Sequence, residues 1–155
     1  MPSISKARIK FYFLKNVTSL RNRSSLKRFL SRLFKKENKT LGSLNYIFCS
    51  DSYLLTINKK YLNHNYYTDI LTFPLSVSNQ AISADIYISI DRIKENASYF
   101  QTTIHQELHR VIFHGALHLC GYNDKSKRQI SLMRKKEDEY LSFYINNFVP
   151  RETTN

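Results

Sequence analysis

Cysteine, glycine and proline are scarce in this chain of 155 residues, which contains two, three and three of them. So little glycine and proline argues against collagen-like, linker-rich and turn-dense all-β proteins, and it favours helices joined by short connections. Cys49 and Cys120 are too few for a disulfide framework and are not spaced as a CxxC pair. We therefore interpret both as small buried apolar residues.

Long apolar runs are also missing. No segment approaches the roughly 18 consecutive apolar residues that a membrane span requires. The first 17 residues contain four basic side chains, which interrupt the sequence before the apolar core of a signal peptide could form. We therefore expect a cytoplasmic protein.

Apolar residues are nevertheless abundant enough to build a core, since 42% of the chain is hydrophobic and 14% is aromatic. A chain of this length typically forms one domain. We expect a single domain over residues 1–150 and a loose tail over 151–155.

The spacing of apolar residues predicts the order of secondary structure elements. Strands are expected at 8–14, 44–49, 70–73 and 82–89, and helices at 24–36, 51–61, 91–99, 103–119 and from 126 onward. This order predicts an α+β (mixed α/β) fold, in which helices pack against a small four-stranded sheet.

The formal net charge of +12 is concentrated in the first quarter of the chain. Residues 1–40 contain twelve basic residues and a single acidic residue, Glu37, and so carry +11 of the +12. A local excess of positive charge suits a polyanion, and nucleic acid is the commonest polyanionic partner of small basic proteins.

Much of this charge lies on the helix expected over residues 24–36. Its leucines and phenylalanines recur at helical spacing, whereas Arg28, Arg32 and Lys36 lie off this apolar stripe. We expect these three side chains to contact RNA or a ribosomal surface. The alternatives are a solvated helix face and a membrane-surface helix, but no lipidation signal supports the latter, so no membrane partner is expected.

The most informative stretch is residues 114–124, with the sequence HGALHLCGYND. His114 and His118 lie four residues apart, so on a helix their imidazoles project from the same face and can reach one zinc ion. Gly121 allows a sharp turn with positive φ that can bring Asp124 back as an oxygen ligand. Three protein ligands and one open position form the pattern of catalytic zinc, here at the end of a central helix.

Each of these residues also has a simpler interpretation. Asp124 could be the N-cap of the last helix, and either histidine could be a satisfied polar group at a helix end. Ser126 and Gln129 are themselves spaced as a capping box for that helix. These separate explanations do not account for the combined spacing, so we favour a metal site.

The spacing resembles the zinc site of metzincin-like peptidases, which also combine two histidines four residues apart, a glycine turn and a third ligand. In those enzymes the residue after the first histidine is a glutamate, the general base that activates water. The corresponding residue here is Gly115. Peptide hydrolysis by that mechanism would therefore lack its base.

A second resemblance extends over more of the chain. Residues 114–122 resemble the H-G-x-L-H-L-x-G-Y-D-H signature of the YbeY-type endoribonucleases and rRNA maturation factors, but Asn123 and Asp124 stand where the family has Asp-His. Residues 58–74 resemble the family block N-x-x-Y-R-G-K-D-x-P-T-D-V-L-S-F-P without a gap, and residues 84–89 resemble G-D-I-x-I-S. The third metal ligand implied here is an aspartate rather than a histidine.

The resemblance implies a single-strand-specific endoribonuclease that depends on one Zn²⁺ per chain, held by His114, His118 and Asp124. Such an enzyme would act in ribosomal RNA processing, at the 3′ end of 16S rRNA, and in ribosome quality control, with the small ribosomal subunit as a partner. Two alternatives stay open: a ribosome assembly factor whose zinc is mainly structural, and a metal-dependent hydrolase of another substrate.

The family's arginine in the second block falls on Leu62 here, so no guanidinium is available at that position to bind a phosphate. Lys59, Lys60, His64 or Arg110 would have to supply the positive charge. Arg110 lies one turn before the first histidine of the metal motif, on the same helical face. We therefore expect RNA contacts from the two lysines and a role near the metal for Arg110.

Two further residues complete the predicted site. Glu107 precedes His114 by seven residues and so faces the same way, where it could orient a histidine by accepting a hydrogen bond. A surface salt bridge is the alternative for Glu107. Tyr66 could stack on an unpaired RNA base, although packing in the core is the commoner role of a tyrosine.

Overall fold

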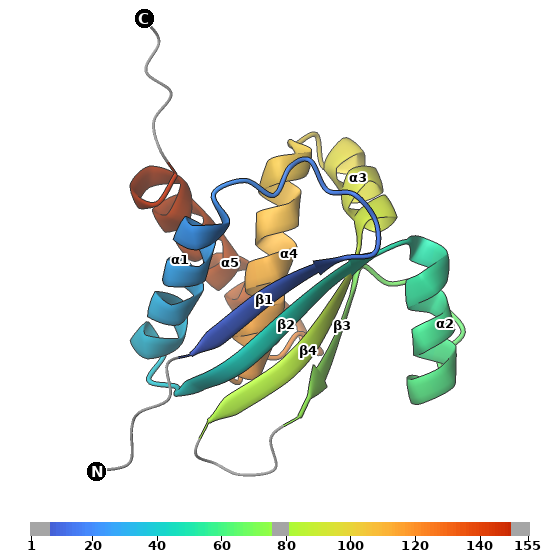
Figure 1. The fold of residues 1–155 in the computed structure, drawn as a ribbon, viewed down its shortest axis with the longest axis horizontal. Helices are drawn as coiled ribbons and strands as arrows, with labels where there is room; N and C mark the ends of the chain where they lie inside the picture. The colour runs from blue at the N-terminus through green and yellow to red at the C-terminus, as the bar shows by residue number, and fades with distance from the viewer. Residues whose placement is uncertain (1–6, 76–80, 150–155) are drawn as a thin grey trace, which may run out of the picture.

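The computed structural model describes residues 7–75 and 81–149, so the predicted tail over 151–155 lies outside the described residues. Within them, four strands form one sheet in the order β1-β2-β4-β3. β1 (Arg8–Phe13), β2 (Leu41–Cys49) and β4 (Ile82–Ser89) run parallel, and β3 (Ile70–Pro74) pairs antiparallel with β4 at one edge (Figure 1). The α+β fold with a four-stranded sheet, expected from the sequence, is confirmed.

Five helices in the described part of the chain surround this sheet: α1 (Arg23–Lys36), α2 (Asp51–Leu62), α3 (Ile90–Tyr99), α4 (Ile104–Leu119) and α5 (Lys127–Asn147). α1, α4 and α5 share a core with one face of the sheet, whereas α2 packs on the other face (Figure 1). α4 is the central helix, because it packs against α1, α3 and α5 as well as against β3 and β4. None of these described helices is long and apolar enough to cross a membrane.

Strand β4 shows how the sequence separates the two faces. Ala84, Ile86 and Ile88 are buried in the main core with α4, while Tyr87 packs with the small cluster that contains Leu54 of α2. This alternation follows from the two-residue period of a strand. The sheet therefore supports α4, and with it the metal motif, on one face only.

Gly115 lets α4 approach the sheet closely. A Cβ atom at this position would lie 2.8 Å from Cδ1 of Ile70 and 3.3 Å from Cγ2 of Ile86, so a larger side chain would require the strands or the helix to shift. The position that carries the general base in metzincin-like peptidases is thus directed at the core in this chain.

The element boundaries differ from expectation mainly at β2, which begins at Leu41 rather than at residue 44. A register shift between Leu41 and Ser43 accommodates Gly42 at a bulge within the strand pair. The last helix begins as expected, since Ser126 is its N-cap and Gln129 completes the capping box.

Candidate metal centre

The two histidines of the motif lie on the last turns of α4, with their ring centroids 4.5 Å apart. α4 ends at Leu119, and Gly121 then adopts a φ of 104°, which reverses the chain as expected. This turn brings Asp124 back to the helix. Its Oδ2 lies 3.4 Å from Nε2 of His114 and 3.3 Å from Nε2 of His118.

These three side chains have the chemistry and the spacing of a zinc site. One ligand atom from each lies within 4.8 Å of the others. In a tetrahedral site with bonds of about 2.0–2.1 Å, neighbouring ligand atoms are about 3.3 Å apart, close to the separations of the Asp124 oxygen from the two nitrogens. The residues present therefore fit a zinc ion that keeps a fourth position for another ligand.

Asp124 is not the N-cap of α5. Ser126 takes that place, because its hydroxyl accepts the backbone N–H of Gln129 at 3.1 Å. The side-chain carbonyl of Gln129 accepts the backbone N–H of Ser126 in return, also at 3.1 Å. The N-cap interpretation of Asp124 is therefore wrong, and its carboxylate is free to face the histidines.

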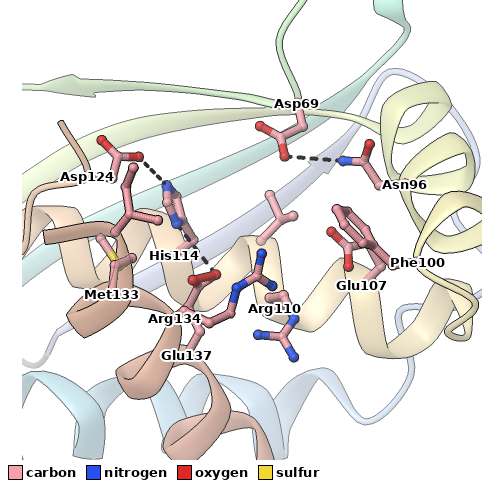
Figure 2. Close-up of a pocket in the computed structure, with 12 residues that line it drawn as sticks. Asp69, Asn96, Phe100, Glu107, Arg110, His114, Asp124, Met133, Arg134 and Glu137 are labelled. Carbon is pink, nitrogen blue, oxygen red and sulfur yellow. Dashed lines mark hydrogen bonds and ion pairs between the residues drawn. The ribbon is translucent and has the colours of Figure 1, made fainter. Parts of the chain in front are cut away.

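Glu137 of α5 is the carboxylate next to His114. Its Oε1 lies 3.6 Å from Nδ1 of His114, so the two ring nitrogens face Glu137 and Asp124 respectively (Figure 2). A carboxylate that accepts the Nδ1–H fixes the ring and presents Nε2 to a metal. Burial alone would lower the pKa of His114, but Glu137, Asp69 and Asp124 outweigh burial and raise this pKa above its ordinary value.

A pocket of about 420 Å³ opens beside His114 and Asp124. Asp69, directly before β3, lines it together with Asn96 of α3, whose side-chain amide donates to Asp69 at 3.4 Å (Figure 2). A substrate in this pocket could reach the fourth position of the metal cluster. Structural zinc sites are closed by protein ligands, so an open pocket favours a catalytic site.

Two carboxyl groups of the pocket, the partly buried Asp69 and the buried Glu107, have shifted pKa values. Burial raises the pKa of Asp69, and it does so although His114 and backbone hydrogen bonds oppose the shift. Burial likewise raises the pKa of Glu107, although Arg110 and Arg134 oppose it. Carboxyl groups of this kind can exchange protons closer to neutral pH, as general acid–base catalysis requires.

The structure places both Arg110 and Glu107 in this pocket. Arg110 also forms an ion pair of 2.7 Å with Asp138 at the surface. Glu107 is buried and its carboxylate forms no hydrogen bond or ion pair within the described residues, so the surface salt bridge considered for it is wrong. The carboxylate that contacts the histidine is Glu137 instead.

The residues expected to contact RNA fall into two separate groups. Exposed basic side chains lie along α1 and at the end of α2, on opposite faces of the sheet: Arg28, Arg32 and Lys36 in the first group, Lys59 and Lys60 in the second. Tyr66, in the loop after α2, is 56% exposed and stacks on His64 with ring centroids 5.1 Å apart. Tyr66 is thus not a core residue, and neither group lines the metal pocket.

Sequence reasoning missed four polar residues of this pocket: Asp69, Asn96, Arg134 and Glu137. Two of them left a signal in the sequence. Glu137 interrupts the apolar stripe of the last helix, and Asp69 occupies the T-D pair of the second family block. The other two reach the pocket from α3 and α5 only through tertiary packing.

This geometry defines a metal-dependent hydrolase, in which the metal ligands stand at the edge of a substrate pocket. The family model described as Endoribonuclease YbeY matches residues 13–145. The chain belongs to this family, as its motifs indicate. Members of the family are endoribonucleases.

Two relatives described as Endoribonuclease YbeY are similar over most of the chain. The Cytophaga hutchinsonii protein is 49% identical over 133 residues, which cover 84% of this chain and 93% of the relative. The Flavobacterium psychrophilum protein is 48% identical over 125 residues, which cover 81% of this chain and 89% of the relative. A solution structure from Thermotoga maritima matches with a TM-score of 0.60 at 28% identity and covers 95% of this chain and 99% of that chain.

Proposed function

We propose that this chain is a zinc-dependent, single-strand-specific endoribonuclease that acts in the cytoplasm on the small ribosomal subunit. Its substrate would be ribosomal RNA near the 3′ end of 16S rRNA, in maturation and in ribosome quality control. The observation that carries the proposal is the convergence of His114, His118 and Asp124 at the edge of an open pocket. These three side chains would hold one Zn²⁺ per chain.

When bound, zinc supplies positive charge that stabilises a phosphoryl oxygen or activates the nucleophile. Glu137, whose Oε1 lies 3.6 Å from Nδ1 of His114, would orient the ring so that Nε2 faces the ion. Asp69, which is oriented by Asn96 in the same pocket, is placed to take or give a proton at the scissile phosphate. α3 and α5 supply these groups from two sides of α4.

The basic helix α1 supports RNA as the substrate. Arg28, Arg32 and Lys36 form no ion pair with another described residue. Arg32 and Lys36 line a groove of about 630 Å³ between α1 and α5, in which the Arg32 guanidinium lies 5.5 Å from the ring centroid of Phe143 and Nζ of Lys36 lies 5.6 Å from that of Tyr140. Unpaired cations beside aromatic rings bind single-stranded RNA through both phosphates and bases.

A second RNA-binding surface lies at the end of α2, where Lys59, Lys60 and Tyr66 are exposed. The side-chain amide of Asn58 donates to the carbonyl of Tyr66 at 2.9 Å, and the Tyr66 hydroxyl lies 3.0 Å from Nδ1 of His64. These contacts hold the tyrosine in place while most of its ring stays accessible for stacking on a base.

Cleavage of a labelled single-stranded RNA by an Asp124→Ala variant, beside the unmodified protein, tests the proposal. We expect Asp124→Ala to lose both zinc and cleavage, because it removes one of three protein ligands. Glu139→Ala, at an exposed position on α5, is the control and should retain both. Equal cleavage by Asp124→Ala and the unmodified protein would overturn the proposal and indicate a contaminating nuclease.

The same RNA annealed to a complementary strand tests the single-strand requirement. We expect the duplex to be cut much more slowly, since its bases are not free to leave the helix and stack on aromatic side chains. Equal rates on both forms would contradict the proposed specificity and leave the metal-dependent nuclease activity intact.

A further inference from the structure

Arg134 of α5 extends over the same pocket as the metal cluster. It lines this pocket with His114 and Asp124, and its guanidinium reaches from α5 toward the side on which Glu107 lies (Figure 2). The guanidinium carbon lies 5.9 Å from the ring centroid of Phe100, another residue of the pocket. This cation–π contact favours a position of the side chain over the pocket.

The guanidinium of Arg134 is not paired with a carboxylate of any described residue, although its charge acts on the neighbouring Glu107. Within residues 7–75 and 81–149 it forms no hydrogen bond or ion pair. The other arginine that lines the pocket, Arg110, is engaged, because its Nη1 lies 2.7 Å from Oδ1 of Asp138. The guanidinium available to an incoming anion is therefore that of Arg134.

The other cations considered for the substrate phosphate lie elsewhere. Neither Lys59 nor Lys60 lines the pocket. Leu62, at the position of the family's arginine, is 40% exposed at the end of α2 and does not line the pocket either. The pocket also contains several carboxyl groups, which repel a phosphodiester unless a cation beside them offsets their charge.

We propose that Arg134 binds the phosphodiester of the RNA beside the metal centre and supplies the guanidinium that this chain lacks at Leu62. This assignment rests on the proposed function, because it names a substrate contact of the same site. A guanidinium donates two parallel hydrogen bonds to phosphate oxygens, which fixes the phosphate as well as attracting it. Arg134 is then a substrate-binding residue and not a metal ligand.

The test compares Arg134→Gln and Arg134→Lys with Arg128→Gln in the zinc-loaded full chain. Arg128 is exposed on the same helix and does not line the pocket. We expect Arg134→Gln to lower kcat/KM on a single-stranded RNA oligonucleotide by about 10- to 100-fold, the effect of one charge-assisted contact. The kcat/KM of Arg134→Lys should lie between those of Arg134→Gln and the unmodified protein, because lysine keeps the positive charge but lacks the planar guanidinium that donates two parallel hydrogen bonds. Arg128→Gln should behave as the unmodified protein, and zinc content should be equal in all of them.

A second readout does not depend on cleavage. In the presence of EDTA, binding of the same oligonucleotide is measured against salt concentration. Arg134→Gln should make the slope of log Kobs against log salt shallower by about 0.7, the contribution of one phosphate contact on a single strand, and Arg128→Gln should not. If the glutamine variant fails to fold, the lysine variant still reports the loss of the two-pronged contact through kcat/KM.

Two results would overturn the assignment of Arg134. The first is that Arg134→Gln and Arg128→Gln have the same kcat/KM and the same slope of log Kobs against log salt. The other is loss of zinc from Arg134→Gln, because the residue would then support the metal cluster instead of the substrate. The proposed function fails in a different experiment, through an Asp124→Ala variant that cleaves RNA as the unmodified protein does.

Discussion

The hydroxyl of Tyr122 donates a hydrogen bond of 2.9 Å to the carboxylate of Glu37, the C-cap residue of the basic helix α1. Tyr140 of α5 donates to the other oxygen of the same carboxylate at 2.6 Å. Only 15% of the Glu37 side chain is exposed. One acidic residue of the basic N-terminal region thus joins α1, α5 and the loop that leads from Gly121 to Asp124.

Removal of the Tyr122 hydroxyl should weaken this junction. We expect Tyr122→Phe to lower the free energy of unfolding by about 1–2 kcal/mol, because a largely buried carboxylate loses one donor. Zinc should also bind several-fold more weakly, because the loop that carries Asp124 is less well fixed. Urea denaturation and competition with a zinc chelator measure the two effects. Tyr99→Phe, at a position that is 80% exposed, is the control. If Tyr122→Phe binds zinc as tightly as Tyr99→Phe, the loop that carries Asp124 is fixed without the Tyr122 hydroxyl.

Exchange of the third ligand should change the pH dependence of cleavage. We expect Asp124→His to retain zinc, since it offers another nitrogen in the place of a carboxylate oxygen. A neutral ligand leaves more positive charge on the ion, so the nucleophile loses its proton more easily and the pH–rate profile moves toward lower pH. Rates measured across the pH range on single-stranded RNA test this, and a profile that does not move or that moves upward would contradict the role of Asp124 as a ligand.

Charge reversal on α1 should flatten the salt dependence of RNA binding. The triple variant Arg28→Glu, Arg32→Glu and Lys36→Glu removes three phosphate contacts, so the slope of log Kobs against log salt should become shallower by about 2. A triple reversal of exposed residues on α5, at Lys127, Arg128 and Lys135, changes the net charge equally and is the control. Equal slopes for the two triple variants would show that α1 acts only through overall charge.

Acid should destabilise the fold through His109, on the buried side of α4. Its Nδ1 donates to the carbonyl of His105 at 2.7 Å, and its ring stacks on Tyr144 with centroids 5.1 Å apart. Burial lowers the pKa of His109 from 6.5 to about 4. Above pH 6.5 the ring is neutral in both states, whereas between pH 6.5 and 4 the unfolded chain binds a proton that the folded chain does not. The free energy of unfolding should therefore decrease as the pH falls from 6.5 to 4, and His109 should account for about 3 kcal/mol of this decrease.

Urea denaturation at several pH values measures this loss. His109→Phe should flatten the decline between pH 6.5 and 4, because phenylalanine cannot bind a proton. His64→Phe, in the exposed loop after α2, should leave the decline as it is. A decline that is identical in all three proteins would show that other groups cause it.

Features that depend on neighbouring residues could be predicted from the sequence. His114, His118, Gly121 and Asp124 lie in one short stretch, so helical geometry and one glycine turn suffice to bring the three ligand atoms within 4.8 Å. The capping box at Ser126 likewise depends on four consecutive residues. Spacing alone is informative in both cases because the chain itself fixes the distances.

Features that depend on distant segments could not be predicted. Glu107 and Glu137 both lie on helices that face the pocket, and only the packing of α5 on α4 decides that Glu137 contacts the histidine. Arg134 is one of many basic residues in the sequence, and its place over the pocket follows from that same packing. The early start of β2 was missed because Gly42 resembles a loop residue until its pairing with β4 is known.

All three candidate zinc ligands come from the continuous stretch 114–124, where α4 ends. The loop that a bound ion would close is therefore short, and closing it costs less chain entropy than in a site whose ligands come from separate strands. The carboxyl groups beside the ligands come from outside this stretch, Asp69 from the segment before β3 and Glu137 from α5. The ligand set is thus local in the sequence, whereas the pocket beside it exists only where α5 packs on α4.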